Sequence, residues 1–488
     1  MKILPFSLVL LFITTVSLAV AEQCEADSGA LSRASFPRGS SSARRPRRTR
    51  SRAWPIRAVE GPVSGTSLIP NNATGEVTVD EYQRYKEDVN IMKKMGFDTY
   101  RFSISWSRIF PEGAGKVNWV GVEYYDRLIN YMLEQGITPY ANLYHYDMPL
   151  ALENEYMGWL SPRVVEAFAD YADFCFKMYG DRVKNWFTFN EPRVVAALGY
   201  DNGFHAPGRC TGCPLGGDSA TEPYIVAHHL LLSHATAVKR YREKYQTCQK
   251  GKIGILLDFV WYEGLTNSTA DQDAARRARD FHVHSPYYIR AIPESMRKIV
   301  KERLPNFTCE EVEMVKGSAD YIGINQYTTY YVKNFLNTSY LSYSNDWHVE
   351  FLYERNGVPV GQRAHSDWLY IVPWGLYKAV TYIKENYGSP IMLLSENGMD
   401  QPGNVTLPGA LNDAQRINYY KSYITELKKA IDDGADVRGY FAWSLLDNFE
   451  WRLGYTSRFG IVYVDFKTLK RYPKNSAYWF KNMIQRKN

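Results

Sequence analysis

From about residue 80 onward, short apolar runs alternate with longer amphipathic stretches. The amphipathic stretches repeat apolar residues at three- and four-residue spacing, which predicts helices over 80–95, 122–135, 162–179 and 412–433. The apolar runs predict seven strands: Phe97–Trp106, Ile137–Tyr146, Val183–Pro192, Lys252–Tyr262, Ala319–Tyr327, Ile391–Gly398 and Val437–Asp447. This alternation is typical of a parallel sheet covered by helices.

Seven strands without a Gly-rich dinucleotide-binding turn favour a (β/α)8 TIM barrel over a doubly wound sheet. A barrel of this kind needs eight strands, and the first one should precede residue 80. Residues 32–58 lack alternation and are rich in Arg, Ser and Pro. We interpret them as a disordered basic segment that replaces the first strand.

The composition places the chain among soluble globular proteins, with 45% hydrophobic and 23% charged residues. The net charge of +6 arises near the N-terminus, because residues 22–60 hold nine Arg and only four acidic residues and Lys2 adds one positive charge. Residues 61–488 are therefore net neutral. A nucleic-acid partner would need a basic face on the folded body, so we expect none.

The N-terminus predicts a signal peptide over residues 1–21. Lys2 precedes an almost wholly apolar stretch over 3–20, and Ala19-Val20-Ala21 is a small-residue cleavage site. A membrane anchor is the alternative, disfavoured because the run is short and no charged stop follows it. No later run is long enough to cross a bilayer, and the chain ends without a KDEL-type retention signal, so we expect the apoplast or the vacuole.

Entry into the secretory pathway makes two further features interpretable. Five sequons are candidate glycosylation sites, at Asn72, Asn267, Asn306, Asn337 and Asn404. Cys210 and Cys213 are close enough for a local disulfide. They could instead form half of a zinc site, but no second Cys pair or clustered His supplies the other ligands, so we expect no metal.

Polar residues gather where the predicted strands end, which is where a barrel builds its active site. Two carboxylates stand out, Glu191 and Glu396, each directly after an apolar run. A pair of carboxylates facing one bond can cleave a glycoside, provided that their environments push their pKa values apart. Each has a structural alternative: a Glu before Pro can begin a helix, and a Glu before Asn-Gly can lie in a turn. Trp443, taken alone, can be a core residue.

Five motifs make the chain resemble the plant β-glucosidases of glycoside hydrolase family 1 over about residues 70–488. They are Y-R-F-S-I-S-W-S-R-I (100–109), H-Y-D-M-P (145–149), T-F-N-E-P (188–192), S-E-N-G (395–398) and W-S-L-L-D-N-F-E-W (443–451). The resemblance implies three segments: a signal peptide (1–21), an atypical Arg-rich segment (22–69) and a catalytic barrel (70–488).

The resemblance also implies the roles of individual residues. Glu191 would be the acid/base and Glu396 the nucleophile of a retaining reaction, with Arg101 beside Glu396. The substrate-binding residues would be His145, Asn190, Asn325, Tyr327, Trp443, Glu450, Trp451 and Phe459. Trp443 would be the sugar platform, Tyr327 would donate to the nucleophile, and Trp368 would form a wall of the aglycone cleft. Cys210–Cys213 would be a loop disulfide of the family.

The chain departs from the family in three places. The opening strand of the family, with a Gln and a Glu-Gly, is missing, and the Arg-rich segment in its place is typical of translation in a shifted frame. V-H-S-P-Y-Y-I-R-A-I-P (283–293) replaces a Gly-Trp-aromatic run. His282 precedes this run and His284 lies within it, and two His without a carboxylate are a weak metal signal. Tyr146 stands where many relatives have Trp.

The sequence therefore predicts a retaining β-glucosidase that needs no cofactor and acts on small β-glucosides or short β-linked gluco-oligosaccharides. Because Glu191 is present, a glucosinolate hydrolase of the myrosinase branch is less favoured. Two alternatives stay open: a catalytically impaired or merely sugar-binding relative, which the missing strand favours, and a transglucosidase using the same residues. The oligomeric state is not readable from the sequence.

Overall fold

The computed structural model describes residues 69–283, 292–336 and 339–484. All of them lie within one compact unit, Arg57–Asn488. The predicted signal peptide, the replacement of the first strand by residues 22–68, the sequon at Asn337 and His284 lie outside the described residues.

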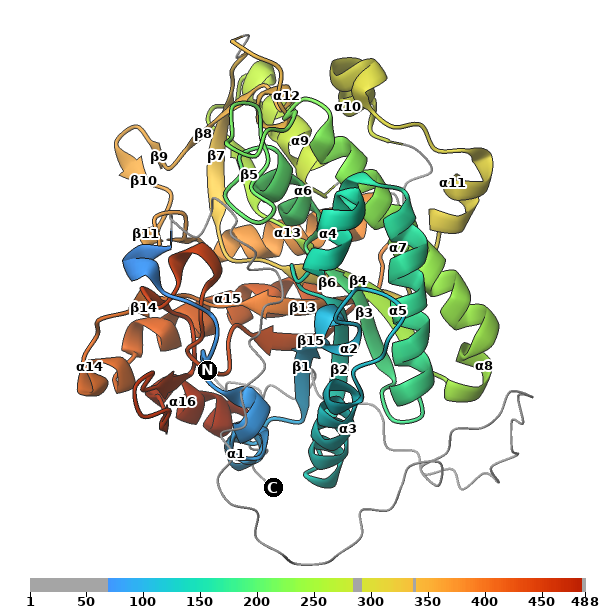
Figure 1. The fold of residues 1–488 in the computed structure, drawn as a ribbon. Helices are drawn as coiled ribbons and strands as arrows, with labels where there is room; N and C mark the ends of the chain where they lie inside the picture. Colours follow the sequence, from blue (N-terminus) through green and yellow to red (C-terminus); the bar gives the residue numbers. More distant parts are fainter. Residues whose placement is uncertain (1–68, 284–291, 337–338, 485–488) are drawn as a thin grey trace, which may run out of the picture. The chain divides into compact units, whose positions relative to one another are not determined.

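The centre of the fold is a parallel sheet of seven strands (Figure 1). In spatial order these are β1 (Thr99–Ser103), β2 (Thr138–Tyr144), β3 (Asn185–Asn190), β4 (Lys252–Asp258), β6 (Tyr321–Asn325), β13 (Met392–Asn397) and β15 (Val437–Ala442). Each falls within one of the seven predicted runs, so the prediction of seven parallel barrel strands is confirmed. β1 and β15 are the two ends of this sheet, and the part of the chain that the structure describes places no strand between them.

Aromatic side chains fill the interior of the sheet. The ring of Tyr140 on β2 lies 6.1 Å from Phe187 on β3 and 5.2 Å from Phe441 on β15. Phe187 in turn contacts Tyr321 on β6, with ring centroids 5.2 Å apart. Side chains from strands near opposite ends of the sheet therefore meet in one layer, as in the packed interior of a barrel.

Helices follow the strands in the predicted rhythm. The larger ones are α1 (Glu81–Met95), α3 (Trp119–Glu134), α5 (Arg163–Tyr179), α7 (Glu222–Lys244), α9 (Thr269–Val283), α13 (Pro373–Asn386), α15 (Ala414–Asp432) and α16 (Asn475–Ile484). The shorter ones are α2 (Trp106–Ile109), α4 (Leu150–Tyr156), α6 (Pro192–Tyr200), α8 (Gln246–Gln249), α10 (Glu294–Val300), α11 (Cys309–Val315), α12 (Tyr343–Asp346) and α14 (Leu407–Leu411), with 3-10 turns η3 (Pro70–Asn72), η4 (Gly158–Leu160), η5 (Lys301–Arg303) and η6 (Trp451–Leu453).

One predicted strand is wrong in its second half. Residues 252–262 were expected to form a single barrel strand, but β4 ends at Asp258 and Trp261 begins β5 (Trp261–Gly264). β5 belongs to a separate sheet with β7 (Thr329–Asn334) and β8 (Val349–Leu352). Since both segments are apolar and buried, hydrophobicity alone did not separate them. The remaining short strands are β9 (Glu354–Arg355), β10 (Val358–Pro359), β11 (Gln362–Arg363), β12 (Tyr370–Ile371), β14 (Gln401–Pro402), β16 (Ser457–Arg458), β17 (Val462–Val464) and β18 (Arg471–Pro473).

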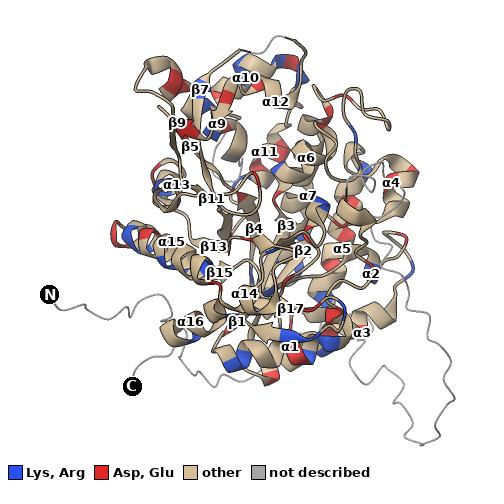
Figure 2. Ribbon diagram, turned by 90° about the vertical axis from the view of Figure 1, so that its left-hand side faces the viewer, with Lys and Arg blue, Asp and Glu red and all other residues tan. Residues whose placement is uncertain are grey.

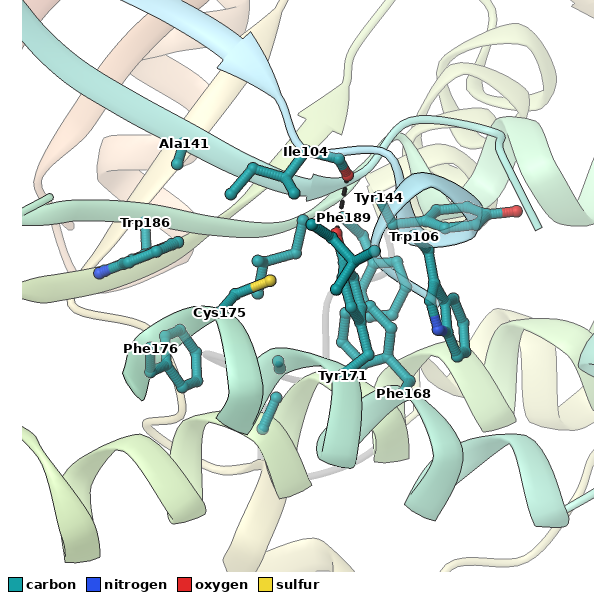
Figure 3. Close-up of a cluster of buried hydrophobic side chains, with 14 of the residues drawn as sticks. Ile104, Trp106, Ala141, Tyr144, Phe168, Tyr171, Cys175, Phe176, Trp186 and Phe189 are labelled. Atoms are coloured by element: carbon teal, nitrogen blue, oxygen red, sulfur yellow. Dashed lines mark hydrogen bonds between the residues drawn. The ribbon is translucent and has the colours of Figure 1, made fainter. Parts of the chain in front are cut away.

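Helix α5 shows how the core positions a strand end (Figure 3). Its Phe168 ring stacks on Phe189 of β3 with centroids 4.3 Å apart, and its Tyr171 ring stacks on Trp106 at 5.2 Å. The Tyr171 hydroxyl donates to the carbonyl oxygen of Ile104 at 2.7 Å. Helix α5 therefore packs against Phe189, which precedes Asn190, and also binds the segment that follows β1.

Figure 2 shows Lys and Arg mixed with Asp and Glu on the helices, for example on α1 and α3. Several of these charges pair within one helix, such as Arg84 with Glu87 and Arg127 with Glu123, both at 3.4 Å. Among the residues that the structure describes, no helix combines the length and apolar character that crossing a membrane would require.

Candidate active site

The carboxyl ends of the barrel strands bring the predicted site residues together. β3 ends at Asn190 and Glu191 follows it; β6 ends at Asn325; and β13 carries Ser395 and Glu396. Glu396 is paired in register with Asn325. Because these strands are parallel members of one sheet, their carboxyl ends bring both carboxyl groups to the same edge of the sheet.

Glu396 is buried and is held by two donors. The guanidinium Nη2 of Arg101, on β1, lies 2.7 Å from its Oε1. The hydroxyl of Tyr327 donates to its Oε2 at 2.6 Å. A cation and a hydroxyl donor both stabilise a charged carboxylate. The ion pair with Arg101 and the hydrogen bond from Tyr327 therefore fix the orientation of the Glu396 carboxyl group.

Glu191 lies in a different environment. Burial, together with the negative charges of Glu396 and Asp258, raises the pKa of its carboxyl group to about 8. Asn325 Nδ2 donates to its Oε1 at 2.8 Å and the Tyr146 hydroxyl donates to its Oε2, and both contacts lower the pKa. The balance keeps a proton on Glu191 near neutral pH.

Glu191 also adopts an unusual backbone conformation. Its φ is 45°, in the left-handed region, and it is the residue before the first turn of α6. The alternative that a Glu before Pro begins a helix is therefore correct as well, since Pro192 is the first residue of α6. Tyr146 and Trp451 share positive φ values, 66° and 45°. Non-glycine residues in this region gather at functional sites, where the surrounding structure enforces the strain.

Two asparagines join the carboxylates into one network. Asn190 Oδ1 accepts hydrogen bonds from Arg101 Nη2 at 2.9 Å and from Asn325 Nδ2 at 3.0 Å. Asn190 Nδ2 lies 3.2 Å from His145 Nε2. Burial holds the pKa of His145 well below its usual range, so this imidazole is neutral and can accept from Asn190. Ser395 donates from its hydroxyl to Asn325 Oδ1 at 2.7 Å, which fixes the amide orientation of Asn325.

Aromatic rings from the loops after β2 and β15 lie beside this network. The His145 ring is 5.8 Å from Trp443 and 5.3 Å from Trp451. Arg101 lies 5.9 Å from the Trp443 ring. Burial raises the pKa of Glu450 to about 7, and Asn448 Nδ2 donates to its Oε2 at 3.1 Å. Flat apolar rings and buried hydrogen-bonding groups side by side suit a sugar ring with its hydroxyl groups.

The two remaining predicted residues contact Tyr327. The ring of Trp368 lies 5.7 Å from it, edge to face, and the ring of Phe459 lies 6.2 Å from it. Trp368 is partly exposed, whereas Phe459 is only 1% exposed. Phe459 thus supports Tyr327, while Trp368 presents surface at the site.

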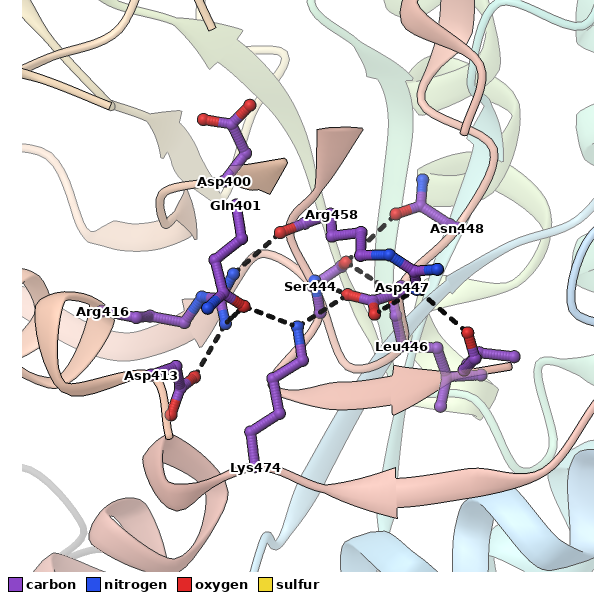
Figure 4. Close-up of polar contacts among 12 residues, drawn as sticks. Asp400, Gln401, Asp413, Arg416, Ser444, Leu446, Asp447, Asn448, Arg458 and Lys474 are labelled. Carbon is purple, nitrogen blue, oxygen red and sulfur yellow. Dashed lines mark hydrogen bonds and ion pairs between the residues drawn. The ribbon is translucent and has the colours of Figure 1, made fainter. Parts of the chain in front are cut away.

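A buried ionic network supports the loop that carries Glu450 and Trp451 (Figure 4). Asp447 accepts from Lys474 Nζ at 2.9 Å and from Arg458 Nη1 at 2.8 Å. Arg416 donates to Asp413 at 2.7 Å and to the carbonyl oxygen of Arg458 at 2.7 Å. The loop after β15 is therefore tied to α15 and to the residues preceding α16.

Cys210 and Cys213 form a disulfide with Cα atoms 5.0 Å apart, so the alternative of a zinc half-site is wrong. Four predicted sequons, at Asn72, Asn267, Asn306 and Asn404, are exposed. This exposure is what glycosylation requires.

Two features of the site were missed in the sequence. The hydroxyl of Tyr146 contacts Glu191, although the sequence marked this residue only as an aromatic exchange. His282 was considered only as a weak metal ligand, but its Nε2 lies 2.9 Å from Asp258, which also pairs with Arg193 of α6. Arg193 and Asp258 each lie at or near the end of a barrel strand, and this placement could have indicated that the two side chains meet.

A barrel that brings two carboxyl groups together at the carboxyl ends of its strands has the catalytic groups of a glycoside hydrolase. Residues 64–488 match the family described as glycosyl hydrolase family 1. The chain belongs to this family.

Relatives and solved structures agree with that assignment. The chain is 66% identical to Beta-glucosidase 26 of Oryza sativa subsp. japonica, covering 94% of this chain and 92% of that protein. It is 62% identical to Beta-glucosidase 44 of Arabidopsis thaliana, covering 96% and 94%. A rice Os3BGlu6 β-glucosidase mutant, solved in a covalent complex with glucose, superimposes with a TM-score of 0.84 at 48% identity, covering 86% and 91%. The expected family and the expected TIM-barrel fold are thus confirmed.

Proposed function

We propose that this protein is a retaining β-glucosidase that hydrolyses β-D-glucosides or short β-linked gluco-oligosaccharides. The observation that carries the proposal is the contrast between Glu191, whose pKa is raised to about 8, and Glu396, which is paired with Arg101 at 2.7 Å. Retention requires one carboxyl group that donates a proton and one that attacks as an anion. The relatives named above support glucose as the sugar.

The reaction proceeds in two displacements. A carboxylate oxygen of Glu396 attacks the anomeric carbon, while Glu191 gives its proton to the glycosidic oxygen and the aglycone leaves as an alcohol. The product of this step is a glucosyl ester of Glu396. Glu191, now ionised, takes a proton from a water molecule whose oxygen attacks the same carbon and releases Glu396 and β-glucose.

The residues around the carboxylates bind the sugar and the leaving group. We assign hydrogen bonding of the glucose hydroxyl groups to His145, Asn190, Glu450 and Trp451. Trp443 forms the platform under the sugar ring, and Asn325 and Tyr327 line the site, with Phe459 behind Tyr327. Trp368 is assigned to the wall of the aglycone cleft, because its ring lies beside Tyr327 and is partly exposed.

The experiment is the intact-protein mass after incubation with 2,4-dinitrophenyl 2-deoxy-2-fluoroglucoside. The fluorine slows the second displacement, so a working nucleophile keeps one fluoroglucosyl group. We expect a stoichiometric mass gain that Glu396→Gln abolishes. No gain on a folded, soluble chain would overturn the proposal and favour a relative without turnover.

The route of the protein is part of the proposal. We infer that residues 1–21 are removed as a signal peptide and that the mature protein reaches the apoplast or the vacuole. The exposed sequons at Asn267, Asn306 and Asn404 support this route. The mass of the protein purified from plant tissue tests it: cleavage after Ala21 and a mass loss on deglycosylation are expected, and an intact, unglycosylated chain would contradict it.

A further inference from the structure

The hydroxyl group of Tyr146 contacts the proposed acid/base, Glu191, but the reaction described above assigns no role to Tyr146. It follows His145 directly after β2 and adopts a left-handed backbone with φ 66°. This conformation turns its side chain toward the site. Its hydroxyl donates to Glu191 Oε2 and accepts a hydrogen bond from Asn190 Nδ2 at 3.2 Å.

The ring of Tyr146 is fixed as firmly as its hydroxyl. Its centroid lies 4.6 Å from Trp451, 5.0 Å from His145 and 5.8 Å from His205. Trp451 is one of the residues assigned to the sugar, and Glu191 acts on the leaving group. Tyr146 therefore connects the part of the site that holds the sugar to the group that protonates the departing oxygen.

We propose that Tyr146 is a positioning residue for the acid/base, holding the Glu191 carboxyl group against the leaving-group oxygen. Asn325 fixes Oε1 and Tyr146 fixes Oε2, so the carboxyl plane has two anchors. An acid works only within hydrogen-bond reach of the atom that it protonates, so the loss of one anchor lowers the rate of the proton-assisted step. This inference rests on the proposed function.

The same hydrogen bond favours the ionised form of Glu191, which makes its loss visible in a pH profile. The groups that surround Glu191 come from several elements: Glu396 on β13, Tyr327 after β6, Asp258 at the end of β4, Arg193 on α6, Arg101 on β1, and His145 with Tyr146 after β2. Of these, Glu396 and Asp258 raise the pKa of Glu191 and Tyr146 lowers it. None of the others changes in Tyr146→Phe, so the shift reports the lost hydroxyl.

The test compares the wild type with Tyr146→Phe on two substrates. Dinitrophenolate leaves without a proton, whereas the alcohol of cellobiose needs one. For Tyr146→Phe we expect kcat/KM on cellobiose to fall about tenfold, the loss for one hydrogen bond to a charged group, while kcat/KM on 2,4-dinitrophenyl glucoside stays within about twofold. The alkaline limb of the cellobiose profile should move up by about one pH unit.

Tyr144→Phe is the matched control. Tyr144 is buried two residues earlier, on β2, and its hydroxyl accepts from Trp159 at 2.9 Å rather than contacting the site. It should leave the substrate ratio and the alkaline limb unchanged. Tyr146→Phe keeps the ring and therefore its packing. A third variant, Glu191→Gln, removes the carboxyl group that Tyr146 positions. Its pH profile should therefore lack the alkaline limb.

The outcomes separate this inference from the proposed function. If the wild type hydrolyses neither substrate, the proposed function fails. A second outcome is that the wild type and Glu191→Gln behave as expected while Tyr146→Phe loses kcat/KM equally on both substrates and its alkaline limb does not shift. In that case Tyr146 has only a structural role, and the inference alone is overturned.

Discussion

Arg101 and Glu396 form an ion pair between strands that are not neighbours in the sheet. Arg101 Nη2 lies 2.7 Å from Glu396 Oε1, and Arg101 Nη1 donates to the carbonyl oxygen of Ser395 at 2.9 Å. β1 is one end strand of the sheet, while β13 is separated from β1 by β15 across the opening of the described sheet. This arginine thus connects β1, at one end of the sheet, with β13, the strand next to the other end, and it fixes the carboxyl group of Glu396.

Arg101→Lys should inactivate the enzyme although it keeps the charge. Lysine has one nitrogen and cannot serve Glu396, Ser395 and Asn190 together. We expect the rate of labelling by the dinitrophenyl fluoroglucoside to fall by about 100-fold, the size of effect seen when a fixed charge-stabilising donor is removed.

Arg127→Lys is the control for that variant. Arg127 forms an exposed pair with Glu123 at 3.4 Å on α3 and should tolerate the exchange. A labelling rate of Arg101→Lys within twofold of the wild type would show that a point charge suffices.

The raised pKa of Glu191 predicts where activity is lost at high pH. The protonated acid is the active form in the first displacement, so kcat/KM should fall as pH rises through about 8. The limb should be measured with cellobiose. It should be absent in Glu191→Gln assayed with 2,4-dinitrophenyl glucoside, and a limb that persists in this variant would belong to another group.

The strand ends and the long helices could be predicted, because burial of one face repeats apolar residues at a spacing that is visible in the sequence. α5 illustrates this: Phe168, Tyr171 and Cys175 recur at three- and four-residue spacing and all are buried. Contacts between residues that are far apart in the sequence produce no such repeating pattern. Arg193 and Asp258 are 65 residues apart, and their pairing depends on how β3 and β4 lie side by side. The break between β4 and β5 was missed because both segments are equally apolar.

The placement of Glu191 and Glu396 at the carboxyl ends of barrel strands was predictable, because each stands at the end of an apolar run. The contact of Tyr146 with Glu191 was not, since it depends on a left-handed backbone at Tyr146 rather than on residue type. The N-terminal segment poses a different question, because its composition indicates a shifted reading frame. Reads across the transcript that encode the Arg residues of 33–57 without a compensating shift would confirm the chain as written.

Tyr171→Phe should lower stability without altering the catalytic groups. It removes the donor to the buried carbonyl oxygen of Ile104, and an unsatisfied buried carbonyl costs about 1–3 kcal/mol. The free energy of unfolding from urea denaturation measures the loss. Tyr82→Phe serves as the control, because its exposed hydroxyl donates to Val120 at 3.4 Å and should cost little. Equal stability of the two variants would mean that Ile104 finds another donor.

Lys474→Met should destabilise the protein more strongly than any exposed lysine variant. The side chains of Lys474 and Asp447 are both 0% exposed, and Lys474 Nζ lies 2.9 Å from Asp447 Oδ1. Methionine keeps most of the length of the side chain but removes the amino group that donates to Asp447, and breaking a buried pair costs about 3–5 kcal/mol.

The expected result is a lower urea midpoint for Lys474→Met and an unchanged one for Lys467→Met, since Lys467 is exposed on the surface. Because Asp447 precedes the loop that carries Glu450 and Trp451, the Lys474→Met variant should also show a raised KM for β-glucosides at temperatures where it is still folded. A loss of stability with an unchanged KM would indicate that Arg458, which also donates to Asp447 at 2.8 Å, holds the loop by itself.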